Sequence, residues 1–219
     1  MTNSNPTYSP GIHNPWKAPM YCIIFGILLR GLGFEVFWLY YSMPILGGML
    51  LFWGSHTLRN RHPAFETASK MALGLLAIDV LGFIFSFIAV IAILPALIIN
   101  ILLLLQLRKG VKAEYARSGM EQKPDVFLWY ILYPFLAIAL ALFSIVLFPL
   151  VILICIGIIC LLVWIIYHMF HMVTTLGEIS PDLEKTLAET QNPSVQMQVA
   201  TSVAFALIYL ALCILISYL

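Results

Sequence analysis

Long apolar runs separated by short polar stretches fill most of the chain. The longest run extends from Met71 to Leu107 and holds one ionisable side chain, Asp79. As a single helix it would be about 55 Å long at about 1.5 Å per residue, whereas the hydrocarbon core of a bilayer is about 30 Å thick. We therefore expect two antiparallel membrane helices here, with the chain reversing near Ala89 and Val90.

The same alternation along the rest of the chain predicts an all-α fold, a polytopic transmembrane bundle of six to seven helices arranged as antiparallel hairpins. Residues 1–16 are expected to form a mobile polar tail and residues 17–219 a single membrane domain. The apolar runs place the helices at about Pro19–Leu32, Ser42–Leu58, Pro63–Phe87, Val90–Gln106, Val126–Leu147, 150–172 and Val195–Leu219.

Local signals refine the second of these helices. Ser42 is a residue type that caps helices, and Pro44 suits a first turn because its missing N–H is not needed there. Gly47 and Gly54 are seven residues apart and share one face, which predicts close approach by a neighbouring helix. Arg30, at the end of the first helix, is expected to reach the far interface and pair with Glu35.

Composition sets the class of protein. Hydrophobic residues make up 62% of the chain and charged residues 10%, and the mean hydropathy is +1.00. A soluble domain carries roughly 25% charged residues, so this chain has more apolar surface than a water-soluble core could hide. The net charge of +1 provides no field that would recruit nucleic acid. The four cysteines lie in apolar runs, where small buried thiols are the ordinary interpretation.

The distribution of Lys and Arg predicts the orientation. If seven helices cross the bilayer, ten of the eleven basic residues fall on one side, and Arg30 alone lies on the other. The positive-inside rule makes the ten-residue side cytoplasmic. We therefore expect a multi-pass protein of the plasma membrane, with a cytoplasmic N-terminus and, for seven spans, an external C-terminus.

Asp79 and Asn100 are the first candidate site, for a substrate or an ion. A reversal near Ala89 and Val90 brings them to one depth near the bilayer centre. Ionisable residues at that depth face the interior of the bundle and commonly mark substrate or ion pathways. The alternative is a neutral carboxylic acid hydrogen-bonded to the amide, which would only fasten the hairpin.

His168, His171 and Glu178 are the second candidate site. The two histidines are three residues apart on one helix surface, and Glu178 lies seven residues further along the same stripe if the helix continues through Gly177. These side chains are suitable zinc ligands, and His56 lies on the same side of the membrane. Histidines at a helix end are also common as interfacial residues, so both interpretations stay open.

The charged stretch from Arg108 to Asp125 is the third candidate site. Juxtamembrane Lys and Arg attract anionic lipids by about 1 kcal/mol each. We therefore consider a headgroup contact on the cytoplasmic side by Arg108, Lys109, Lys112 and Arg117. The same charges serve equally as a topology signal. A membrane-protein partner or a second copy of the chain is a further expected contact beside the lipid bilayer.

One segment carries a resemblance to known proteins. From Gly47 to Lys70 the chain reads GGMLLFWGSHTLRNRHPAFETASK. This resembles small multi-pass membrane proteins of Gram-positive anaerobic bacteria, in which a glycine-rich span ends in a basic turn before a Phe-x-x-Ala helix start. The resemblance implies a bacterial plasma membrane. It carries over neither an activity nor a functional residue.

Three functions stay open on this evidence. The first is a small transporter-like or substrate-binding membrane subunit with a polar site at Asp79 and Asn100. The second is a structural or accessory subunit of a larger membrane complex, and the third is a metal-dependent membrane enzyme. The chain has no glycine-rich phosphate loop, HExxH, GxSxG or CxxC motif. We therefore expect no cofactor, and we favour a non-enzymatic role.

Overall fold

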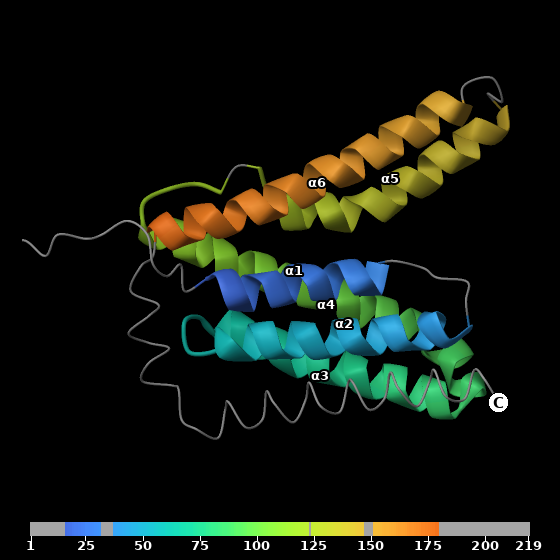
Figure 1. The fold of residues 1–219 in the computed structure, drawn as a ribbon, viewed down its shortest axis with the longest axis horizontal. Coiled ribbons are helices and arrows are strands. Elements are labelled where there is room, and N and C mark those ends of the chain that lie inside the picture. Colours follow the sequence, from blue (N-terminus) through green and yellow to red (C-terminus); the bar gives the residue numbers. More distant parts are fainter. Residues whose placement is uncertain (1–15, 32–36, 123, 147–150, 180–219) are drawn as a thin grey trace, which may run out of the picture.

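The computed structural model describes residues 16–31, 37–122, 124–146 and 151–179. All regular structure in these residues is helical, as predicted, and Figure 1 shows its arrangement. The six helices of this part of the chain are α1 Lys17–Gly31, α2 Phe37–Thr57, α3 Pro63–Ile84, α4 Ser86–Arg117, α5 Val126–Val146 and α6 Val151–Ile179.

The start of α3 follows the local signals closely. The His62 side chain caps the helix, accepting a hydrogen bond from the Ala64 backbone N–H at 3.1 Å, and Pro63 occupies the first helical position. Lys70 donates a hydrogen bond to Glu66 one turn away, at 2.7 Å. The helix ends at Ile84, and Phe85 is extended at the junction with α4.

Several predicted boundaries are wrong. Helix α4 continues to Arg117, beyond Gln106, and α6 continues to Ile179, beyond residue 172. The reversal between α3 and α4 lies at Phe85 and not near Ala89 and Val90, so α4 begins four residues earlier than expected. Likewise, α2 begins at Phe37, which places Pro44 inside the helix. Membrane helices tolerate an internal proline because neighbouring groups satisfy the carbonyl that it leaves free. Ser42 therefore does not cap α2, and its buried hydroxyl has no hydrogen-bond partner among the described residues.

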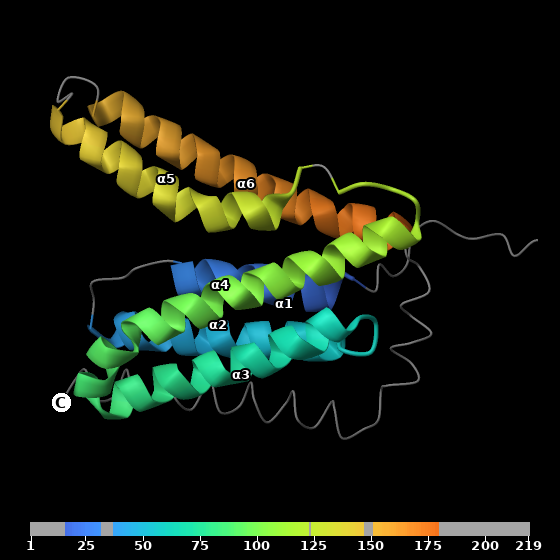
Figure 2. The same cartoon turned by 180° about the vertical axis from the view of Figure 1, so that it is seen from behind.

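Helices α1 to α4 lie side by side as an antiparallel bundle, with α1 on α2, α2 on α3 and α3 on α4 (Figures 1 and 2). The first residues of α1, α3 and α5 and the last residues of α2, α4 and α6 lie at the same end. We call it the basic end, because every described Lys and Arg except Arg30 lies at or near it. Arg30 lies toward the opposite end.

The hydrophobic core occupies the half of the molecule nearest the basic end. Its fully buried side chains include Trp16, Met20, Phe65, Leu107, Phe127 and Met169. Trp16 belongs to the segment expected as a tail, yet it is buried, with its ring centroid 6.5 Å from that of Phe65. Toward the opposite end the helices expose large apolar side chains, among them Ile91, Leu94, Ile138 and Ile152.

Helices α5 and α6 form a hairpin that packs on the bundle near the basic end and diverges from it toward the opposite end (Figures 1 and 2). Trp129 of α5 and Trp164 of α6 meet edge to face, with ring centroids 6.0 Å apart. The rings of Tyr21 and Phe25, on α1, contact the Phe170 ring of α6, with centroid distances of 5.5 and 5.9 Å. These rings join the hairpin to the bundle.

Three helical segments are long and apolar enough to cross a membrane: Pro63–Ile84, Ile93–Arg117 and Ile152–Ile179. The expected helix over Val195–Leu219 lies outside the described residues. Cys22, Cys155 and Cys160 are free thiols, but the expectation that they are buried is wrong: Cys22 is half-buried, and Cys155 and Cys160 are exposed on α6. Cys213 lies outside the described part.

Candidate functional site

Asp79 is bound to Arg30, a residue 49 positions earlier in the chain. The Asp79 carboxylate accepts hydrogen bonds from both terminal nitrogens of Arg30, with the Nη2–Oδ1 distance at 3.4 Å. Arg30 Nη1 also donates to the Pro44 carbonyl oxygen at 3.0 Å. One guanidinium therefore links α1, α2 and α3.

Two glycines of α2 make room for this arginine. A methyl group on Gly47 would lie 2.7 Å from Arg30 Cγ, and one on Gly48 would lie 3.4 Å from Arg30 Nη1. The Arg30 side chain therefore runs across the glycine surface of α2 to reach Asp79. In the sequence, the signal for this arrangement is a lone arginine near one helix end combined with a Gly-Gly pair on the next helix.

Asn100 does not lie beside Asp79, because the chain reverses at Phe85. Asp79 is six residues before that reversal, so its depth matches residue 91 of α4. Asn100 is nine residues further along, about 13–14 Å at about 1.5 Å per residue. Asp79 itself is five residues, or about 8 Å, from the C-terminal end of α3. Glu35, the expected partner of Arg30, lies outside the described residues.

The Arg30–Asp79 pair is largely closed off from solvent. The Arg30 side chain is 10% exposed and the Asp79 side chain 14%. Nearby, the Tyr130 hydroxyl of α5 donates to the Ile27 carbonyl oxygen in the last turn of α1 at 3.3 Å. Chemically, the arrangement neutralises two charges inside the bundle and joins three helices.

Asp125 organises the charges of the predicted headgroup site. Its Oδ2 accepts hydrogen bonds from Arg108 Nε and Lys112 Nζ, both at 2.8 Å, and its Oδ1 accepts from the Leu128 backbone N–H at 3.3 Å. Two opposite effects act on the pKa of the Asp125 carboxyl, and partial burial by itself would raise it. The hydrogen bonds from Lys112, Arg108 and Leu128, with the Arg108 charge, outweigh that effect and lower the pKa below its usual value.

A second acidic residue, Glu114, lies buried among basic residues. Its side chain is 1% exposed and accepts a hydrogen bond from Arg117 Nη1 at 2.8 Å. Arg61, on the turn between α2 and α3, approaches it at 3.9 Å and lies 6.0 Å from the centre of the Trp16 ring. Arg117 Nη2 donates to the Arg61 carbonyl oxygen at 3.1 Å. These contacts attach the end of α4 to the α2–α3 turn.

The four headgroup candidates therefore differ in their surroundings. Arg108 and Lys112 are paired with Asp125, and Arg117 is paired with Glu114. Lys109 is exposed and forms no ion pair with any described residue. Sequence reasoning identified the basic residues and missed the acidic partners. The signal for Asp125 is its position just before an apolar helix, where Asp is a preferred cap.

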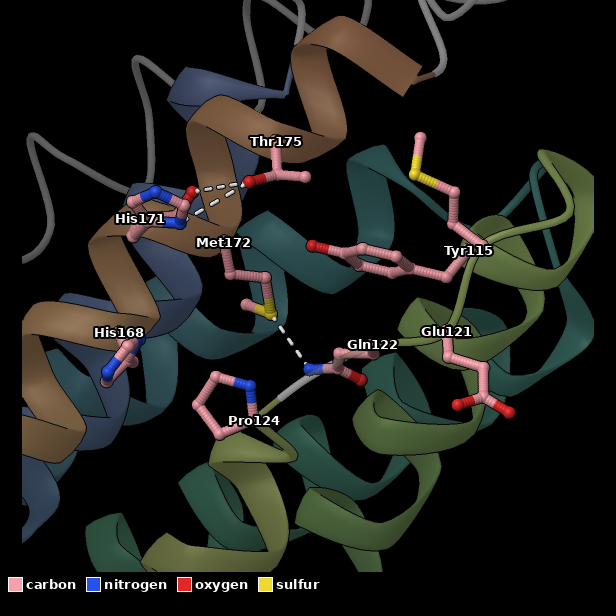
Figure 3. A pocket seen from close by; sticks show the side chains of 9 residues that line it. Tyr115, Glu121, Gln122, Pro124, His168, His171, Met172 and Thr175 are labelled. Atoms are coloured by element: carbon pink, nitrogen blue, oxygen red, sulfur yellow. Dashed lines mark hydrogen bonds between the residues drawn. The ribbon is translucent and has the colours of Figure 1, made fainter.

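The predicted metal ligands are only partly brought together. Helix α6 continues through Gly177 to Ile179, and His168 and His171 lie near each other with ring centroids 6.5 Å apart. Both line a cavity of about 170 Å³ at the basic end, shown in Figure 3. Glu178 is exposed on the same helix and does not line this cavity.

His56 lies elsewhere, on α2. It contacts Arg59, and its Nδ1 is 3.5 Å from Ser69 Oγ of α3. Within the described part of the chain, no three His, Cys, Asp or Glu side chains converge as a metal site requires. The interpretation as a zinc enzyme consequently has no assembled ligand set in these residues.

Comparisons with family models, with curated proteins and with solved structures gave no match. The resemblance of the Gly47–Lys70 segment to small membrane proteins of Gram-positive anaerobes stays a prediction.

Proposed function

We propose that the protein is a structural or accessory subunit of a larger membrane complex, with helices α1 to α6 as six spans and Val195–Leu219 as a seventh. The observation that carries this proposal is the Arg30–Asp79 pair. It occupies the position that a substrate or ion would need, and the two side chains are 10% and 14% exposed. A carboxylate already neutralised by an arginine from another helix is a poor cation site.

The role proposed for this pair is to hold three helices in register. Each charge inside a membrane bundle is costly on its own, and pairing offsets much of that cost. Removing one partner from a buried ion pair costs roughly 3–5 kcal/mol, whereas replacing both with apolar residues is often neutral. A registry function of this kind needs neither turnover nor a substrate path.

The orientation is part of the same proposal. The basic end faces the cytoplasm, in accord with the positive-inside rule, so the N-terminus is cytoplasmic and a seventh helix would end outside. Of the four headgroup candidates, the exposed Lys109 is the one best suited to meet an anionic headgroup at that surface. The apolar side chains exposed on α5 and α6 face lipid or a neighbouring membrane protein.

Thiol labelling at Asp79 tests the proposal against transport. In a variant whose native cysteines are replaced by alanine, Asp79→Cys is treated with a small water-soluble thiol reagent in folded protein. We expect labelling as slow as at Leu75→Cys, which is buried on the same helix, and much slower than at Phe85→Cys, which is 47% exposed. Rapid labelling at position 79 would reveal an aqueous path and support the substrate-binding function instead.

A double-substitution cycle tests the registry role separately. Arg30→Met and Asp79→Leu should each lower the stability of the folded protein by roughly 3 kcal/mol, and the double variant should recover most of that loss. Thermal unfolding in detergent provides the measurement. Additive losses in the double variant would show that the two side chains act independently, contrary to the proposal.

A further inference from the structure

The cavity between α4, α6 and the loop after α4 combines donor atoms of an unusual kind. Two imidazoles, of His168 and His171, line it together with the thioethers of Met120 and Met172. The remaining wall includes Tyr115 and Gln122 (Figure 3). Four of the lining side chains are therefore nitrogen or sulfur ligands suited to a soft metal ion.

The sulfur of Met172 faces the cavity. Gln122 Nε2 donates to Met172 Sδ at 3.3 Å across this space, as Figure 3 shows, although the rest of the Met172 residue is buried. Met169, one turn earlier, is buried in the apolar core and does not line the cavity. Two neighbouring methionines of α6 thus have different surroundings, and only one presents its thioether to the cavity.

The spacing along α6 brings the ligand atoms to one surface. His168 and His171 are three residues apart, and His168 and Met172 are four apart, the separations at which helical side chains are neighbours. The two imidazole centroids are 6.5 Å apart. A metal held in line between two imidazole nitrogens, at about 2.0–2.1 Å from each, sets the centroids about 6 Å apart. The spacing of the two rings therefore matches joint ligation once their nitrogens turn toward one metal ion.

Neighbouring polar groups can orient the ligands. Thr175 Oγ1 lies 3.5 Å from His171 Nδ1, and it donates to the His171 carbonyl oxygen at 3.1 Å, which leaves the other ring nitrogen for a metal. Gln122 Oε1 is buried and has no hydrogen-bond partner among the described residues. An imidazole bound to a metal presents a free N–H, and an amide oxygen in the same wall is a suitable acceptor.

We propose that this cavity binds Cu(I) through His168, His171 and the Met172 thioether. Thioether and imidazole ligands together favour Cu(I), whereas zinc sites in proteins rely on Cys, His and carboxylate ligands. Glu178 does not line the cavity, and Glu121, which does, forms no metal-holding group with the two histidines in the described part of the chain. The ring contact between His168 and Trp164, with centroids 4.6 Å apart, is enough to explain where His168 lies. It does not explain the Met172 sulfur facing the same space.

The test is a titration with Cu(I) of the purified full-length protein in detergent, with all four cysteines replaced by alanine in every variant because thiolates also bind Cu(I). It is done under a reductant and in competition with a chromogenic Cu(I) chelator. We expect one Cu(I) per chain at this site and binding of Zn²⁺ that is at least about tenfold weaker. Met172→Leu and a combined His168→Gln and His171→Gln variant should each weaken Cu(I) binding by about tenfold or more. Met169→Leu is the matched control and should leave the affinity unchanged.

Thermal unfolding keeps the result interpretable if a variant loses stability. Saturating Cu(I) should raise the unfolding temperature of the wild type and of Met169→Leu, and should have little effect on Met172→Leu. Unchanged Cu(I) affinity in folded Met172→Leu, or Zn²⁺ binding as tight as that of Cu(I), would overturn the proposal. Either result leaves the Arg30–Asp79 interpretation unaffected, because that pair lies toward the other end of the bundle.

Discussion

Asp125 shows how one side chain can serve two elements. Its Oδ1 accepts from the Leu128 N–H in the first turn of α5, and its Oδ2 accepts from Arg108 and Lys112 near the end of α4. The carboxylate therefore caps the hairpin and ties it to the bundle. Charge-assisted hydrogen bonds of this kind are stronger than neutral ones, and each is worth roughly 1.5–3 kcal/mol when well formed.

We predict that this attachment weakens in acid. The pKa of Asp125 is lower in the folded protein than in the unfolded chain, so its contribution is complete above about pH 4 and is lost as the pH falls through the folded pKa. Asp125→Asn retains a capping side chain and removes the charge. Thermal unfolding should find the variant less stable by about 1–2 kcal/mol near neutral pH.

The informative quantity is the difference in stability between wild type and Asp125→Asn. This difference should shrink as the pH falls below about 4, because the wild-type carboxyl is then protonated and uncharged, like the amide of the variant. A difference that stays constant down to about pH 2 would mean that the ionised form of Asp125 contributes nothing specific.

At the level of helices, glycine sets the distance between α1 and α2. A methyl group on Gly54 would lie 2.5 Å from the Pro19 carbonyl oxygen, and one on Gly47 would lie 2.7 Å from the Gly26 carbonyl oxygen. The glycine face predicted from the seven-residue spacing is therefore confirmed as a close helix contact. Backbone atoms cannot rotate away as side chains do, so these contacts fix the separation of the helices.

We predict that Gly54→Ala destabilises the protein by about 1–3 kcal/mol, because α1 and α2 must move apart to admit the methyl group. The matched control is Gly74→Ala on α3, where an added methyl group meets no atom within 4 Å. That change should be neutral or stabilising by up to about 1 kcal/mol through helix propensity. Chemical or thermal unfolding in one detergent compares the two, and equal stabilities would contradict the prediction.

At the scale of the whole molecule, charge and packing are unevenly distributed. The core and almost all described basic residues lie near the basic end, and exposed apolar side chains predominate toward the opposite end. A protein built this way has one end suited to water and anionic headgroups. The other part of its surface is suited to hydrocarbon or to another membrane protein.

We predict the orientation from this asymmetry. In intact cells, Ser118→Cys just after α4 should be protected from a membrane-impermeant thiol reagent, and Phe85→Cys at the α3–α4 reversal should be labelled. The background again lacks native cysteines, and permeabilised cells are the control, because Ser118→Cys should then be labelled too. Labelling of Ser118→Cys alone in intact cells would mean that the basic end faces outward.

The candidate sites were predictable only in part. Local spacing sufficed for the His168–His171 proximity, because it depends on the geometry of one helix. The expected partner of Asp79 depended on where the chain reverses, and an error of four residues in that position placed Asn100 beside it. The partner found, Arg30, lies on α1 and depends on how α1, α2 and α3 pack together. Hydropathy changes gradually along Met71–Leu107, so it does not locate a reversal to within one turn.

The sequence by itself determined the helical class, the sharp separation of basic from apolar segments and the start of α3 at Pro63, because these follow from local composition and short-range geometry. The tertiary structure decided which residues meet across helices: Arg30 with Asp79 and Pro44, Asp125 with Arg108 and Lys112, and Glu114 with Arg61 and Arg117. Such pairs depend on the relative shift and rotation of helices distant in the chain. Packing of whole side chains fixes that shift, and it leaves no periodic signal in the sequence.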